Sequence, residues 1–416
     1  MTSKLNTVSV VGLGYIGLPT AAFFAQAGLN VIGVDVNQRY VDEINAGRVP
    51  FFEPGFAALL SQVVSSGSLK AQAETPEADA YVVAVPTPFK EGYEVDDKYI
   101  VSAARGIAPK LKGGELLILE STSPPGLTER MGQVVLDLRP DLTIEPGRDN
   151  SIYLAHCPER VLPGQIMEEM ANNDRIIGGV NEESTQLAVS LYETFVEGEI
   201  LRTDARTAEM AKLTENSFRD VNIAFANELS VIASRLGIDV FELIELANHH
   251  PRVSILQPGC GVGGHCIAVD PWFIVSSAPE EAKLIRQARE TNDSKPQFVI
   301  DQVEQQLRTV HGDRAVALLG IAFKPDIDDL RESPALSIAE QLGKSHPDVK
   351  FHVVEPNIET LPSSLNKLKN LRLVSLEEAL EKSELVVLLV DHTPFKSVNR
   401  ESLAQKKVVD TRGIWR

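Results

Sequence analysis

Three glycines near the start of the chain constrain its fold more than any other feature. Gly12, Gly14 and Gly17 follow the apolar run Thr7–Val11 and precede a helical segment that starts near Leu18. A GxGxxG pattern between a strand and a helix lets backbone amides approach a pyrophosphate at the helix N-terminus. The alternative is that the glycines only allow a tight turn to pack.

An acidic residue follows at the spacing that dinucleotide binding requires. The next apolar run ends at Asp35, about 20 residues after the glycines, where a carboxylate accepts hydrogen bonds from the adenosine ribose. Strand, glycines, helix, strand and acid together predict a dinucleotide site and favour NAD over NADP. Arg39 argues weakly the other way, because an arginine just beyond this strand can hold a 2′-phosphate; otherwise it is a solvated helix residue.

Short apolar runs continue to alternate with helical stretches up to about residue 203, which is typical of a parallel sheet. We predict strands at residues 7–11, 30–34, 80–84, 116–119 and 151–156. Thr87 and Thr122 follow two of these strands, at positions where doubly wound sheets touch a cofactor. Both predict cofactor contacts, although either segment could simply form a rigid turn.

A long helix and a second alternating region follow. Asp204 is a suitable cap for a helix over residues 205–236, a stretch without Gly or Pro. From near Gly312 we predict a strand, a helix capped by Ser333 with Pro334 in its first turn, and two more strands, at residues 315–319, 351–354 and 385–390.

The predicted fold class is therefore α/β, with two doubly wound Rossmann-like domains joined by a long central helix. We predict domains at residues 1–203, 204–310 and 311–416. Ligands of such sheets bind in crevices at the carboxyl ends of the strands. A cleft between the two Rossmann-like domains is thus the expected active site.

Net charge and cysteine content limit the possible partners and the cellular location of the protein. The formal charge of −18 argues against nucleic acid or an anionic membrane as a partner. Only three cysteines occur, so a secreted disulfide framework is not expected. The apolar stretch over residues 8–34 is broken by glycines and polar residues and lacks a cleavage-like ending, so it predicts neither a signal peptide nor a membrane span. We expect a cytoplasmic protein.

One cysteine stands in a glycine-rich segment. In PGCGVGGHCIAVDP, residues 258–271, Cys266 directly follows Gly263, Gly264 and His265. A flexible turn can expose a thiol to backbone amides, which makes it more nucleophilic. The alternative is a small buried side chain, which we expect for Cys157 and Cys260. No second cysteine pair exists and the adjacent His249 and His250 have the wrong spacing, so no metal is expected.

These ordered motifs resemble the UDP-glucose/GDP-mannose dehydrogenase family over nearly the whole chain. The stretch GVGGHCIAVDPWF, residues 261–273, is similar to the branch that oxidises UDP-N-acetyl-D-mannosamine, whereas other branches usually carry GGSC and Pro-Lys-Asp. Cys260 departs from the proline that relatives often have. The resemblance implies a four-electron, NAD-dependent oxidation of a sugar C6 alcohol through a thiohemiacetal and a thioester on Cys266.

The resemblance also assigns roles to other catalytic residues. Lys212 and Asn216, four apart on the long helix, would stabilise an oxyanion; their spacing alone favours an exposed polar stripe. Glu159 would activate the hydrolytic water, unless it only pairs with Arg160. Asp270 would act through water beside Lys212, unless it only forms an Asp-Pro turn.

Binding residues follow in the same way. Arg331 would contact the cofactor and Lys324 the substrate, although alone both read as surface charges. Arg252, beside His250, would reach the substrate of a neighbouring subunit in a homodimer built on the central helix. Arg160 completes the predicted substrate contacts. The domain at 311–416 would bind the UDP-sugar, and the domain at 204–310 would carry the dimer contact and the cysteine loop.

Other functions fit parts of the same pattern. UDP-N-acetyl-D-glucosamine and UDP-glucose are alternative substrates. A two-electron hydroxyacid or phosphogluconate dehydrogenase shares a similar first domain but needs no thiol. A binding protein that senses NAD would show cofactor affinity without turnover.

Overall fold

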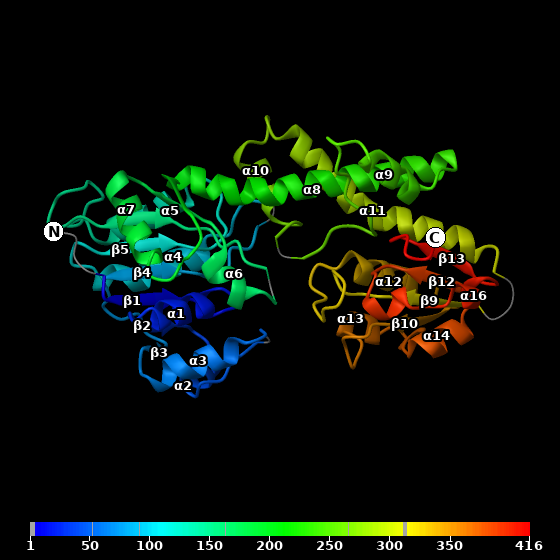
Figure 1. Ribbon diagram of the computed structural model, residues 1–416, viewed down its shortest axis with the longest axis horizontal. Coiled ribbons are helices and arrows are strands. Elements are labelled where there is room, and N and C mark those ends of the chain that lie inside the picture. Colours follow the sequence, from blue (N-terminus) through cyan, green and yellow to red (C-terminus); the bar gives the residue numbers. More distant parts are fainter. Residues whose placement is uncertain (1–4, 52, 91, 163, 265, 311–313) are drawn as a thin grey trace. The chain divides into compact units, whose positions relative to one another are not determined.

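The computed structural model in Figure 1 describes residues 5–51, 53–90, 92–162, 164–264, 266–310 and 314–416. The chain forms two compact units, residues 1–215 and 216–416. The long helix α8, Ala205–Leu236, runs from one unit into the other. His265 and Gly312 lie outside the described residues. The predicted division into three domains and the predicted cleft stay predictions.

The N-terminal unit is built on one eight-stranded sheet in the order β3-β2-β1-β4-β5-β6-β7-β8. All neighbouring strands pair in parallel except β6 and β7. The five predicted strands are confirmed as β1 (Thr7–Val11), β2 (Asn30–Val34), β4 (Ala80–Val83), β5 (Leu116–Leu119) and β6 (Tyr153–His156). Three more were not predicted: β3 (Leu69–Gln72), β7 (Arg175–Gly179) and β8 (Ile200–Asp204).

Helices cover both faces of this sheet (Figure 1). One apolar core joins the sheet to α1 (Gly17–Gln26), α2 (Gln38–Asn45), α3 (Phe56–Ser65), α6 (Ile166–Asn172) and α7 (Glu182–Tyr192). The other joins it to α4 (Lys98–Ile107), the short 3₁₀ turn Ala108–Lys110 and α5 (Leu127–Leu138). Because both faces are buried, the inner strands are almost entirely apolar.

The long helix begins where the sequence predicts. The Asp204 carboxylate accepts hydrogen bonds from the backbone and hydroxyl of Thr207, at 2.9 and 2.6 Å. One turn later, the buried Glu209 carboxylate accepts from the backbone N–H groups of Gly126 and Thr128, at 2.6 and 2.8 Å. These bonds fix the start of α8 to the N-terminus of α5, where a negative charge is favourable.

The second unit contains a parallel five-stranded sheet in the order β11-β10-β9-β12-β13. The predicted strands are confirmed as β9 (Ala315–Leu319), β10 (Lys350–Val354) and β12 (Leu385–Leu388); β11 (Leu371–Leu373) and β13 (Lys407–Asp410) were missed. Ser333 caps α12 (Pro334–Ser345) as predicted, accepting from the Leu336 N–H at 3.2 Å. The chain is thus α/β with two Rossmann-like sheets.

Helices enclose this sheet as well. One core includes α11 (Lys283–Leu307), α12 and α13 (Ser363–Asn366), and the other includes α14 (Leu376–Lys382), α15 (Thr393–Lys396) and α16 (Arg400–Leu403). Two further helices, α9 (Val240–Asn248) and α10 (Asp270–Ser277), lie between α8 and α11 in the chain. Within the described ranges, none of the helices is long and apolar enough to cross a membrane.

Candidate functional site

The glycine turn leaves room for a ligand at one position and is closed by backbone at two others. A Cβ on Gly12, whose φ is +96°, would lie 2.5 Å from the Ala84 carbonyl oxygen. A Cβ on Gly17 would lie 1.9 Å from the Gly12 carbonyl oxygen. A Cβ on Gly14 would meet nothing within 4 Å. The turn therefore needs glycine for packing at Gly12 and Gly17, while the open space at Gly14 suits a cofactor phosphate.

The acid at the end of β2 is fixed beside this turn. The Asp35 carboxylate accepts from the backbone N–H groups of Leu13 and Asn37, at 2.9 and 2.8 Å. Arg39 instead pairs with Glu43 one turn along α2, and its side chain is 80% exposed. This arrangement matches the solvated-residue interpretation of Arg39, and Asp35 would repel a 2′-phosphate.

Both predicted threonines lie at the same edge of the sheet as Gly12 and Asp35. Thr87 follows β4 and Thr122 follows β5, and both are half-buried. Strands β2, β1, β4 and β5 are consecutive neighbours and run in parallel, so their carboxyl ends meet at one edge. The structure thus gathers the predicted cofactor-binding residues of the N-terminal unit.

Glu159 follows β6 at this edge and is nearly buried. One carboxylate oxygen accepts from the backbone N–H groups of Arg160 and Val161, both at 2.7 Å. The other lies 3.7 Å from the buried guanidinium of Arg175. The Arg160 side chain pairs with Glu215 at 2.7 Å, so the suggested Glu159–Arg160 pair exists only through the backbone.

Glu120 belongs to the segment with Thr122 that the sequence places near the cofactor, but its buried carboxyl was given no role of its own. It lies 3.8 Å from Arg175 and accepts hydrogen bonds from Thr20 and Tyr192, at 3.1 and 3.2 Å. Burial, and then repulsion by Glu159, raises the pKa of Glu120 to about 8. One arginine therefore faces two carboxyl groups, and burial beside Glu159 favours the protonated form of Glu120.

In the second unit, Asn216 and Asp270 are joined directly. The Asn216 amide donates to the Asp270 carboxylate at 2.5 Å, and both side chains are buried. The Asp270 backbone N–H donates to the Cys266 carbonyl at 2.8 Å, so the three predicted catalytic residues lie together. Lys212 is half-buried, one helical turn before Asn216 on α8.

The structure distinguishes the three cysteines as the sequence predicts. Cys266 is exposed, whereas Cys157 and Cys260 are buried, and none of them is in a disulfide. A Cβ on Gly263 would lie 2.3 Å from the Glu332 carbonyl oxygen, and one on Gly264, at φ +87°, would lie 3.0 Å from the Phe323 ring. The glycines thus let the cysteine loop pack tightly against residues 323–334.

That packed segment carries Arg331 and Lys324. Arg331 binds Asp329 at 2.6 Å, and this carboxylate raises the pKa of Arg331, with a smaller contribution from Cys266. The structure therefore places Arg331 within electrostatic reach of the thiol. Lys324 is half-buried.

The predicted substrate residues Arg252 and His250 lie elsewhere in the second unit. Both are exposed in the turn after α9, where the Arg252 backbone N–H donates to the His250 ring at 3.3 Å. Their contact with a neighbouring subunit stays a prediction.

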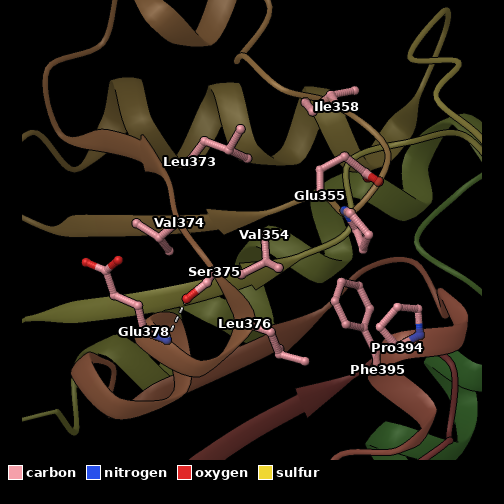
Figure 2. Close-up of a pocket in the computed structure, with 11 residues that line it drawn as sticks. Val354, Glu355, Ile358, Leu373, Val374, Ser375, Leu376, Glu378, Pro394 and Phe395 are labelled. Atoms are coloured by element: carbon pink, nitrogen blue, oxygen red, sulfur yellow. Dashed lines mark hydrogen bonds between the residues drawn. The ribbon is translucent and has the colours of Figure 1, made fainter.

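A hollow of about 550 Å³ lies at the carboxyl ends of β10 and β11 (Figure 2). Val354, Leu373 and Phe395 line it, with Glu355 at its edge. The Glu355 carboxylate is already hydrogen-bonded to the backbone N–H groups of Ile321 and Ala322 and to the His392 ring, at 2.8 to 3.0 Å. No residue of the predicted site lines this hollow. Elsewhere too, the described residues include no cluster of three or more possible metal ligands.

Comparison with known proteins decides the family. The models of the UDP-glucose/GDP-mannose dehydrogenase family match in sequence: the NAD binding domain at residues 6–196, the central domain at 206–294 and the UDP binding domain at 317–416. The chain belongs to this family. It is an NAD-dependent nucleotide-sugar dehydrogenase, and the open glycine turn with Asp35 fits that cofactor.

Individual relatives of this dehydrogenase match over nearly their full length. UDP-N-acetyl-D-mannosamine dehydrogenase of Escherichia coli K12 is 54% identical, with 99% of each chain covered. NDP-N-acetyl-D-galactosaminuronic acid dehydrogenase of Ralstonia nicotianae is 53% identical, over 99% of this chain and 96% of the relative. A solved UDP-D-ManNAc dehydrogenase from Pyrococcus horikoshii is 40% identical with a TM-score of 0.86, covering 99% of this chain and 96% of that one.

Proposed function

We propose that this dehydrogenase oxidises the C6 alcohol of UDP-N-acetyl-D-mannosamine to the uronate through a covalent adduct on Cys266. The observation that carries the proposal is the exposed, reduced Cys266 in a glycine loop beside Asn216, Asp270 and Arg331. A two-electron dehydrogenase has no use for a thiol held in this way.

The reaction divides into two oxidations and one hydrolysis. NAD, when bound, accepts one hydride in each oxidation. In the first, the C6 alcohol loses a hydride and a proton, with Asp270 taking the proton through water and Lys212 and Asn216 stabilising the developing oxyanion. The Cys266 thiolate then forms a bond to the aldehyde carbon, and the carbonyl oxygen takes back the proton from Asp270 through the same water, which gives a thiohemiacetal.

The thiol makes the second oxidation possible. A free aldehyde has no carbon that bears both a hydrogen and an alkoxide oxygen, so it cannot expel hydride. The thiohemiacetal has such a carbon, and when it loses a hydride and a proton it becomes a thioester. Water then attacks the thioester carbon while Glu159 takes a proton from that water. The carbon–sulfur bond breaks, and the carboxylate and the Cys266 thiol are released.

The sugar is inferred from the relatives and from the loop. The Escherichia coli and Pyrococcus horikoshii proteins are named for N-acetylmannosamine, and the Ralstonia relative for N-acetyl-D-galactosaminuronic acid. We therefore rank N-acetylated sugars above UDP-glucose, with UDP-N-acetyl-D-glucosamine as the next candidate after the mannosamine epimer.

A panel assay tests this function. Purified enzyme is incubated with limiting UDP-N-acetyl-D-mannosamine, UDP-N-acetyl-D-glucosamine, UDP-N-acetyl-D-galactosamine or UDP-glucose and excess NAD. We expect two NADH per sugar consumed, at the highest kcat/KM with the mannosamine epimer. A yield of one NADH would indicate an aldehyde product, and a preference for another sugar would replace the substrate assignment.

We further propose a homodimer in the cytoplasm. Phe218, Phe225 and Ile232 are spaced by seven residues on α8, and their side chains are 69%, 53% and 45% exposed. Seven residues are two helical turns, so these side chains share one face, and large exposed apolar faces mark contact surfaces. A second copy of the chain, presenting the same face, would cover it. Three reduced cysteines suit the reducing cytoplasm.

A further inference from the structure

A row of four polar side chains is buried beneath the cysteine loop. Asp220 and Asn227 come from α8, and Arg289 and Asn292 come from α11. Each is at most 1% exposed, although none of them belongs to the catalytic set described above. Buried polar groups cost stability unless they are hydrogen-bonded, so the partners of these four explain their presence.

The hydrogen bonds form one continuous chain from the loop into the helix pair. The Gly259 backbone N–H donates to Asn227 Oδ1 at 2.9 Å, and Asn227 Nδ2 donates to Asn292 Oδ1 at 2.9 Å. Asn292 Nδ2 then donates to Asp220 Oδ1 at 2.7 Å. A backbone N–H can only donate and a carboxylate can only accept, so the two ends fix the orientation of both amides between them.

A second branch leads back to the other end of the loop. Arg289 Nη1 donates to Asp220 Oδ1 at 2.6 Å and makes a longer contact of 3.5 Å with the Ile267 carbonyl oxygen. Gly259 and Ile267 flank the segment that carries Cys266. Arg289 Nη2 also donates to Asp293, so two carboxylates hold the branch that reaches Ile267, and Asp220 is the one that both branches share.

The arrangement is not the one that stability alone favours. Asp220 Oδ2 and Arg289 Nε have no hydrogen-bond partner among the described residues, and both atoms are buried. A partly satisfied buried ionic network is often less stabilising than apolar packing of the same volume. The presence of this network is better explained by the segment of backbone that it holds in place.

We propose that Asp220, Asn227, Arg289 and Asn292 are positioning residues that hold the Cys266 loop at both ends. This inference rests on the proposed function, because Cys266 has its role there. With the flanks fixed, the thiol stays within electrostatic reach of Arg331, and the Cys266 carbonyl stays bonded to the Asp270 backbone N–H. A displacement of about 1 Å at a reacting group can cost about 100-fold in rate.

The test removes the middle link of the hydrogen-bond network and measures the reactivity of the Cys266 thiol directly. Asn292→Ala is compared with Val303→Ala, which removes buried apolar volume from the same helix without touching the network. We measure kcat, the KM for NAD, the thermal midpoint, and the rate at which iodoacetamide alkylates Cys266 without any sugar. The other two cysteines are buried, so alkylation of the folded protein reports on Cys266.

We expect Asn292→Ala to lower kcat by about 10- to 100-fold, with the KM for NAD within about twofold of wild type. Alkylation at neutral pH should slow by at least about fivefold, because a loosened loop loses the stabilisation of its thiolate by Arg331. Val303→Ala should lower the thermal midpoint but leave both rates within about twofold.

The inference is overturned if Asn292→Ala lowers the thermal midpoint as much as Val303→Ala does but leaves kcat and the alkylation rate of Cys266 unchanged. If Asn292→Ala yields no folded protein, Asn227→Ala, the link next to Gly259, is measured in the same way and must show the same two effects. The alkylation result stands apart from the proposed reaction. A wild-type enzyme that turns over no sugar nucleotide would refute the function, and the network would still be tested.

Discussion

Gly14 is the position where cofactor binding and folding can be separated. Its φ lies outside the left-handed region, and a Cβ there would meet no atom within 4 Å. Alanine therefore fits the folded backbone, and it restricts the unfolded chain more than glycine does. We expect Gly14→Ala to keep or slightly raise the thermal midpoint.

The affinity of Gly14→Ala for NAD should fall, although its thermal midpoint does not. The open space at Gly14 is where a phosphate approaches the backbone, and a charge-assisted hydrogen bond there contributes about 1.5–3 kcal/mol. Losing one such bond raises the Kd for NAD by about 10- to 150-fold, since about 1.4 kcal/mol corresponds to a factor of ten. Isothermal titration with NAD, in the absence of sugar, measures this change.

Gly17→Ala is the matched variant, because its Cβ would lie 1.9 Å from the Gly12 carbonyl oxygen. Overpacking of this kind costs about 1–3 kcal/mol, which corresponds to a thermal midpoint about 2–12 °C lower. The reasoning is refuted if Gly14→Ala binds NAD as wild type does, or if it is destabilised as much as Gly17→Ala.

Two further predictions concern charge and assembly. The pKa of Glu120 rises from its usual 4.5 to about 8 on folding, so the folded protein holds an extra proton between these values. Stability should therefore fall as pH rises from about 4.5 to about 8, by up to about 1.4 kcal/mol per pH unit, and level off above about 8. Glu120→Gln should flatten this dependence of the unfolding free energy on pH, and an unchanged slope would count against the reasoning. Replacing Phe218 and Phe225 by Glu should convert a dimer into monomers in sedimentation velocity, and a variant that still sediments as a dimer would exclude this face as the contact.

The sequence predicted most of the inner architecture, because strands buried on both faces are short apolar runs between turns. Residues 116–119, Leu-Leu-Ile-Leu, are such a case. The missed strands carry polar residues: β3 reads LKAQ and β8 reads ILRTD, and both lie at the edges of their sheet. Alternating or half-exposed strands are hard to distinguish from loops without their neighbours.

Some residues of the candidate site were predicted from the sequence and others were missed. Motifs that are local in sequence, such as the glycine turn and the Cys266 loop, were found because their residues stand close together in the chain and match the family's pattern. Arg175 was missed because its carboxyl partner Glu120 lies 55 positions away, so their pairing is not visible in the sequence. Asp220 and Arg289 are 69 positions apart and were missed for the same reason.

Trapping of the sugar on sulfur is the claim on which the whole account depends, and one measurement tests it most directly. Enzyme is mixed with UDP-N-acetyl-D-mannosamine and NAD, quenched in acid within the first turnover, and analysed by peptide mass spectrometry alongside NADH yield. We expect an acyl adduct on the Cys266 peptide, no adduct and less than two NADH per sugar with Cys266→Ala, and wild-type behaviour with Cys260→Ala. Two NADH per sugar at the wild-type rate from Cys266→Ala would contradict the account.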